Sequence, residues 1–83
     1  MLTHMTAPLT QIVASGVRAE MARQGKTQQQ LASLAGMAQQ TLSRRLRIED
    51  PTPFDIEELE RIAKALAVPA ESFLATPVPS AAA

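Results

Sequence analysis

The stretch QQQLASLAGMAQQTLSRRLR, from Gln28 to Arg47, decides the fold because it holds two short helical patterns separated by Gly36. The first pattern places its apolar residues at the i, i+3, i+4 spacing of one helix face: Leu31, Leu34 and Ala35. The second pattern resumes out of phase with the first: Ala38, Leu42 and Leu46. A sharp turn between two helices needs a residue that tolerates positive φ and close backbone approach, and glycine does both. This segment therefore predicts two helices that meet at a corner.

Further helices are predicted on both sides of this segment, which makes the chain all-α. Residues 9–23 carry an apolar face and precede Gly25, which suits a helix end. Thr27 and Gln30 form a capping-box pattern that predicts a helix over 28–35, and a third helix is expected over 38–47. After a proline-containing connection, Asp55 reads as the cap of a fourth helix over 56–67. Pro69 is expected to open a last short helix, and no segment indicates a strand.

The apolar positions of these helices predict one small aliphatic core. The first helix contributes one face: Val13, Val17 and Met21, with Ile12 and Ala14 beside them. The fourth helix contributes a second: Ile56, Leu59, Ile62, Ala63 and Leu66. The side chains expected to dominate the core are Val17, Leu31, Leu34, Leu42, Leu59, Ile62 and Leu66. At 83 residues the chain is expected to form one domain over 9–75, with a flexible N-terminus at 1–8 and a disordered tail at 76–83.

The composition argues against an enzyme, a metalloprotein and a membrane protein. There is no cysteine, and the single histidine, His4, falls in the N-terminal segment, where Met5 is a possible alternative start. The carboxylates gather at expected helix starts, where caps and helix dipoles explain them. No glycine-rich phosphate loop, metal-ligand spacing, secretory signal or membrane-spanning run occurs, so neither cofactor nor metal is expected. A cytoplasmic protein is the expectation.

The charges are balanced overall but separated along the chain. Residues 18–47 hold six basic residues and one acidic residue, Glu20, whereas residues 49–71 hold seven acidic and two basic residues. Separation of this kind gives a folded domain one positive end, and the local field matters more for a charged partner than the total charge. Two solvated faces are the plainer interpretation. The positive end coincides with the two-helix segment.

The third predicted helix has one polar face without an acidic residue. At about 100° per residue, Gln40, Arg44 and Arg47 project almost opposite the apolar stripe. Two further pairs flank them: Gln39 with Ser43, and Thr41 with Arg45. Glutamine can pair with adenine at two atoms and arginine with guanine at two atoms. An ordinary exposed face usually carries glutamate and lysine, whereas this helix has no acidic residue, which favours an anionic partner.

The start of the second predicted helix suits a phosphate. Its first backbone N–H groups and positive dipole end lie beside Lys26 and Gln28. For Thr27, a simple capping role is the preferred interpretation.

The combined pattern resembles the Cro/repressor (XRE) type of helix-turn-helix. The resemblance rests on Gln28, Ala32 and Gly36 at four-residue spacing, on Leu42, and on the sequences TLSRRLR and DIEELERIAKALAV. It covers about residues 10–75 and implies a compact five-helix, lambda-repressor-like domain with the helix-turn-helix at about 28–47. Ala38 and Arg45 depart from the family pattern, because the family usually has Ser or Thr at the first of these positions and an apolar residue at the second.

The resemblance also implies which residues contact DNA. The second helix would cross the DNA backbone and the third would enter the major groove. The implied base contacts are Gln39, Gln40, Ser43 and Arg44. The expected phosphate contacts are Lys26, Thr27, Gln28, Thr41, Arg45 and Arg47, although Arg45 has the alternative of lying along the surface. Ala32 and Gly36 are implied to let the two helices approach closely.

These observations predict a sequence-specific transcriptional regulator that binds a palindromic operator in double-stranded DNA as a homodimer. The expected dimer surface is the end of the fourth helix with the last short helix, namely Val68, Phe73 and Leu74, although Phe73 has the alternative of closing the monomer core. Two other functions stay open: an antitoxin-type regulator that also binds a toxin, and a helical protein–protein adaptor that uses the acidic fourth helix.

Overall fold

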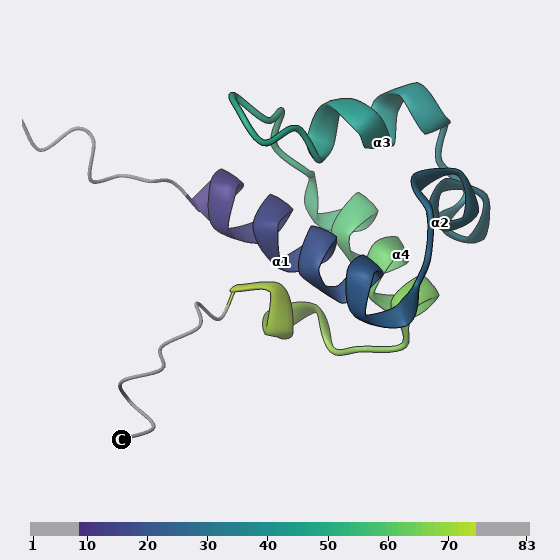
Figure 1. The fold of residues 1–83 in the computed structure, drawn as a ribbon. Helices are drawn as coiled ribbons and strands as arrows, with labels where there is room; N and C mark the ends of the chain where they lie inside the picture. Colours follow the sequence, from purple (N-terminus) through teal and green to yellow (C-terminus); the bar gives the residue numbers. More distant parts are fainter. Residues whose placement is uncertain (1–8, 75–83) are drawn as a thin grey trace, which may run out of the picture.

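The computed structural model describes residues 9–74, which fold into α-helices and one 3-10 helix, with no strand in that range (Figure 1). The elements in chain order are α1 (Leu9–Gln24), α2 (Gln28–Ala35), α3 (Gln39–Arg45), α4 (Ile56–Leu66) and η2 (Ala70–Leu74). The all-α prediction is confirmed. The predicted fifth helix is a 3-10 segment, so residues 9–74 contain four α-helices rather than five. The expectations for residues 1–8, including His4 and Met5, and for residues 75–83 lie outside the described residues.

The ends of α2 and α4 follow the capping signals of the sequence. The Thr27 side chain accepts a hydrogen bond from the backbone N–H of Gln30, and the Gln30 side chain accepts one from the backbone N–H of Thr27. Asp55 and Glu58 form the same reciprocal pair at α4. Gly36 closes α2 in the left-handed conformation with φ 68°, as the corner requires. The capping box at Thr27, the cap at Asp55 and the glycine corner are therefore confirmed, and Glu58 adds a second capping box.

Helix α3 is shorter than the predicted span of 38–47. It begins at Gln39 because Ala38 has the extended dihedrals of an N-cap residue, φ −69° and ψ 139°, and it ends at Arg45. Leu46 follows with φ −102° and ψ 9°, outside the helix, while its side chain stays buried.

The core is the predicted aliphatic cluster with two exceptions. The largest side chains that the fold buries completely are Phe73, Leu31, Leu42, Ile62, Leu66 and Val17. Leu59 is partly buried against them. The predictions that Leu34 and Ile56 lie in the core are wrong, because these side chains are 60% and 78% exposed.

Position on the helix explains both exceptions. At about 100° per residue, the buried Leu31, Ala32 and Ala35 span about 100° of the helix surface, and Leu34 lies about 60° beyond the Leu31 edge of that face. Ile56 is the first residue of α4 and precedes the packed part of that helix. Helical periodicity predicts which side of a helix is buried, but it does not predict how far around the helix, or how close to its end, the buried surface extends.

Helix α1 and η2 pack at van der Waals distance through Gly16. A Cβ atom built on Gly16 would lie 2.9 Å from the carbonyl oxygen of Phe73 and 3.1 Å from its Cα. Both neighbours are backbone atoms, so they cannot rotate away as the end of a side chain would. This requirement could not be predicted from the sequence, because Gly16 lies in the middle of a helical pattern.

We expect Gly16→Ala to destabilise the fold. The clash with η2 should cost about 1 to 3 kcal/mol, more than the gain in helix propensity of up to about 1 kcal/mol. Chemical denaturation would measure the free energy of unfolding. Ser15→Ala is the matched control, since Ser15 is exposed on the same helix and should gain only propensity. A more stable Gly16→Ala variant would contradict the close approach.

Candidate nucleic-acid interface

Helix α3 presents an exposed polar face over a buried apolar one. Leu42 and Leu46 are 0% and 2% exposed and anchor the helix to the core. The four predicted base-contacting residues are all exposed: Gln39, Gln40, Ser43 and Arg44. Thr41 is half-buried on the flank of that face. The structure therefore brings the predicted base readers together on one short helix, which carries no acidic residue from Gln39 to Arg45.

The start of α2 keeps the geometry of an anion site beside its cap. The capping box occupies the N–H groups of Thr27 and Gln30, while the N–H groups of Gln28 and Gln29 belong to the first turn and have no intrahelical partner. Lys26 and Gln28 are half-buried at this end, and Thr27 is exposed. The predicted phosphate contacts of α2 thus lie together, with Thr27 acting as the cap.

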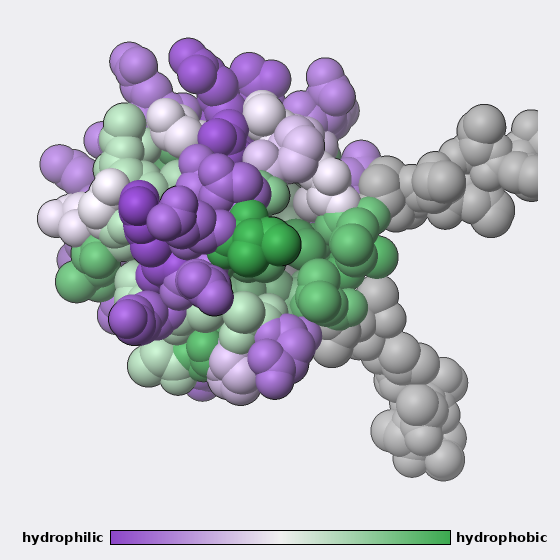
Figure 2. Space-filling model, turned by 180° about the vertical axis from the view of Figure 1, so that it is seen from behind, coloured by the Kyte–Doolittle hydropathy of each residue, from purple (hydrophilic) through white to green (hydrophobic). Residues whose placement is uncertain are grey.

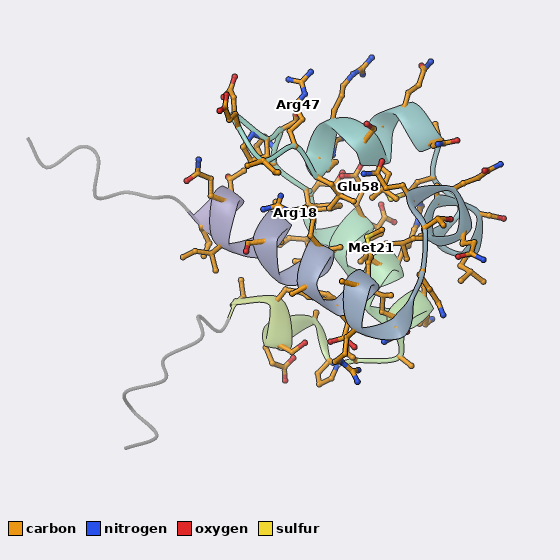
Figure 3. All side chains as sticks on the ribbon, in the orientation of Figure 1. Arg18, Met21, Arg47 and Glu58 are labelled. Atoms are coloured by element: carbon orange, nitrogen blue, oxygen red, sulfur yellow. The ribbon has the colours of Figure 1, made fainter. Side chains whose placement is uncertain are left out.

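Arg45 forms an ion pair with Glu58 rather than projecting freely from α3. Its Nε and Nη2 donate hydrogen bonds of 2.9 and 3.0 Å to the two carboxylate oxygens of Glu58. Both side chains are more than four-fifths buried, and Glu58 lies between α3 and α4 (Figure 3). This pairing turns Arg45 toward α4, so the structure argues against the predicted phosphate contact. Where the resemblance implies an apolar residue, Arg45 joins α3 to α4 through its ion pair with Glu58.

The carboxylate of Glu58 also closes the capping box of α4, and the hydrogen bonds that it accepts lower its pKa. The hydrogen bond from Arg45 is the main cause that lowers the pKa of Glu58, with a smaller contribution from the backbone N–H of Asp55. The Glu58 side chain therefore has two roles: it closes the capping box of α4, and it binds Arg45 of α3.

We expect Glu58→Gln to separate these two roles, because glutamine can still close a capping box but cannot form the ion pair. At pH 7 the variant should be less stable by about 1 to 2 kcal/mol. Because the folded pKa of Glu58 is lowered, its stabilisation is present above the unfolded pKa and is lost as the pH falls through the folded pKa. The difference from wild type should therefore shrink in acid. Denaturation from pH 7 to pH 3 would measure it, and a difference independent of pH would contradict the ion pair.

Three long-range hydrogen bonds donated from α1 were not predicted from the sequence. The Nη1 of Arg18 donates to the backbone carbonyls of Leu46 at 2.9 Å and Arg47 at 3.2 Å. The Nε2 of Gln24 donates to the carbonyl of Leu66 at 2.8 Å. Figure 3 shows Arg18 pointing from α1 toward the end of α3, while the exposed Arg47 points away from α1. In the sequence, Arg18 was only one of several basic residues.

Within residues 9–74, the other kinds of site considered are not found. No cluster of three His, Cys, Asp or Glu side chains there is placed to hold a metal ion. No helix in the same range is long and apolar enough to cross a membrane. The exposed polar face of α3 and the adjoining start of α2 are thus the candidate site.

Comparison with known proteins agrees with this geometry. A family model described as "Helix-turn-helix" matches residues 17–73, which is more than half of the chain. No curated protein and no solved structure matches the chain significantly. The match spans α2, the glycine corner and α3, and it extends through α4 into η2. The chain belongs to the helix-turn-helix family of XRE-type DNA-binding domains.

Proposed function

We propose that this protein is a sequence-specific transcriptional regulator that inserts α3 into the major groove of double-stranded DNA. The observation that carries the proposal is the exposed face of α3, where four polar side chains stand over a buried stripe with no acidic residue among them. Gln39, Gln40, Ser43 and Arg44 contact bases in this proposal. By occupying an operator, the bound protein blocks or recruits polymerase.

The start of α2 and the end of α3 supply the phosphate contacts. Lys26, Gln28 and the first turn of α2 meet the backbone on one side of the groove, with Thr27 beside them. Thr41 and Arg47 contact phosphate from α3 and from the residues that follow it. Arg45 is left out of this set because its guanidinium is bound by Glu58.

Selection from random duplex DNA, followed by titration at several salt concentrations, tests this function. We expect one enriched sequence, and an affinity that falls with salt at a logarithmic slope of about −0.9 per phosphate contact. A protein–protein adaptor would enrich no sequence and show no salt-sensitive DNA binding. That result would refute the proposed function.

The protein acts as a homodimer in this proposal, because one short α3 covers few base pairs and two half-sites multiply specificity. The predicted surface needs correction: Phe73 is 1% exposed and closes the monomer core. The surface proposed instead is apolar and lies beside both ends of the described chain, where it is green in Figure 2. We call it the apolar surface, and it is lined by Leu9, Thr10, Val13, Pro53, Phe54, Ile56, Leu59 and Leu74.

A second copy of this chain fits the apolar surface for two reasons. All of its lining residues are uncharged, so a two-fold contact of the surface with itself opposes no like charges. Leu9 and Ile56 are 59% and 78% exposed and would lose this exposure in the dimer.

We expect Ile56→Glu to abolish dimer formation and leave the monomer folded, since Ile56 is exposed and an acidic residue suits the first turn of a helix. Sedimentation with and without operator DNA would measure the mass. Leu34→Glu is the matched control, because Leu34 is 60% exposed on α2, away from the apolar surface. Wild-type protein that sediments only as a monomer, with and without DNA, would exclude the homodimer.

A further inference from the structure

Helix α3 ends differently from the other α-helices of residues 9–74. Residues in the left-handed conformation follow α1, α2 and α4: Gly25 at φ 69°, Gly36 at φ 68° and Ala67 at φ 58°. Such a residue lets the next backbone N–H groups fold back onto the last carbonyls of the helix. After α3, Leu46 has φ −102° and the chain continues without that turn. The Leu46 N–H donates to the carbonyls of Leu42 and Ser43, and the carbonyls that follow therefore need other donors.

The donors come from two distant parts of the chain. The N–H of Thr52 donates to the carbonyl of Arg44 at 3.1 Å. From the neighbouring helix, Arg18 donates through one nitrogen to the carbonyls of Leu46 and Arg47 at 2.9 and 3.2 Å. A guanidinium is suited to this position because it is always charged and the C-terminal end of a helix attracts a cation.

These two carbonyls have a special relation to Arg47. The carbonyl of Leu46 belongs to the peptide plane before the Arg47 Cα, and the carbonyl of Arg47 belongs to the plane after it. A single nitrogen of Arg18 thus holds the planes on both sides of that Cα, which restricts φ and ψ of Arg47. Because those dihedrals set the direction of the Cα–Cβ bond, Arg18 fixes the point and direction from which the Arg47 side chain extends.

We propose that Arg18 is a positioning residue for DNA binding, which aims Arg47 at a phosphate by holding the backbone that follows α3, without contacting DNA itself. The proposal rests on the proposed function. It explains why Arg18 points toward the end of α3 while Arg47 points outward (Figure 3). The contribution of Arg18 is to order the Arg47 backbone before DNA arrives, which removes an ordering cost from binding.

A double-mutant cycle with Arg18→Met and Arg47→Ala tests this on a random-sequence duplex. We expect Arg18→Met alone to weaken binding about three- to tenfold, and to change it less than about twofold when Arg47 is already alanine. The double variant should keep the salt slope of Arg47→Ala. Arg23→Met is the matched control, because Arg23 is on the same helix and pairs with Glu20 rather than with α3.

The double-mutant cycle also distinguishes two other roles of Arg18, a direct phosphate contact and a purely structural role. If Arg18 itself contacted phosphate, the two substitutions would act independently and the double variant would lose about 1.8 from the salt slope, the value for two contacts. If Arg18 were only structural, the folded variant would bind as tightly as wild type. Either result overturns the proposal. A wild-type protein without salt-sensitive binding would instead overturn the proposed function, and this inference with it.

Amide hydrogen exchange on the free protein gives a readout that needs no DNA. Arg18→Met should raise the exchange rate at Leu46 and Thr52, whose N–H groups donate to carbonyls of α3, while α1, α2 and α4 keep their protection. Unchanged exchange at these amides would refute the positioning role. If Arg18→Met fails to fold, Arg18→Lys replaces it: lysine keeps the charge but lacks the rigid fork, and should give an intermediate loss of DNA affinity.

Discussion

Leu42→Ala is expected to destabilise the protein by about 2 to 5 kcal/mol, the largest effect of any single truncation considered. Leu42 is fully buried at the centre of α3, where it ties the helix to the core. The site is bounded by other buried side chains, among them Leu31 and Leu46, so it cannot collapse to fill the space that the truncation leaves. A small domain has little stability to lose, and such a change can unfold most of the population.

Thermal and chemical denaturation would measure this loss. Leu34→Ala is the matched control, because it removes the same atoms from a side chain that is 60% exposed and should cost far less. Equal effects for the two variants would show that the core does not lie beneath α3.

Arg44→Ala is expected to weaken operator binding by about 1 to 3 kcal/mol and to relax the base preference at one position in each half-site. Arg44 is exposed in the last turn of α3, on the face opposite the buried Leu42. Guanine is the expected base, because arginine can donate to two of its acceptors at once. Gln40→Ala should act in the same way at a neighbouring position.

Arg47→Ala and Lys26→Ala provide the contrast, because phosphate is their expected target. Each should weaken all sequences alike and flatten the salt dependence by about 0.9. Binding measured on the selected operator and on a random duplex separates the two behaviours. An Arg44→Ala variant that lost equal affinity for both duplexes would make Arg44 a backbone contact and would require a different orientation of α3 in the groove.

The parts of the fold that could be predicted are those encoded by neighbouring residues. Thr27 and Gln30 are three positions apart, and their capping box formed as expected. Gly36 supplied the left-handed corner from its own conformational freedom. The exposed face of α3 followed from helical periodicity, since the buried Leu42 and Leu46 fix which side points outward.

The features that could not be predicted depend on tertiary contacts between distant residues. Arg18 and the carbonyl of Leu46 are separated by 28 positions, and Arg45 and Glu58 by 13. Nothing local distinguishes an arginine that binds another helix from one that faces solvent. Leu34 was wrongly predicted to be buried, because an apolar residue near the buried face of α2 can still be exposed. Contact partners therefore had to come from the structure.

The packing of η2 on α1 has a consequence for how the chain folds. The contact at Gly16 and Phe73 joins two residues that are 57 positions apart, so the loop that it closes contains nearly the whole domain. Loops of that length form slowly relative to adjacent helix pairs, because chain entropy opposes them. During synthesis, α2 and α3 leave the ribosome well before Phe73, while the space that Phe73 fills is still open. We therefore expect the helix-turn-helix to form early and to become stable only after η2 has been synthesised and has packed on α1.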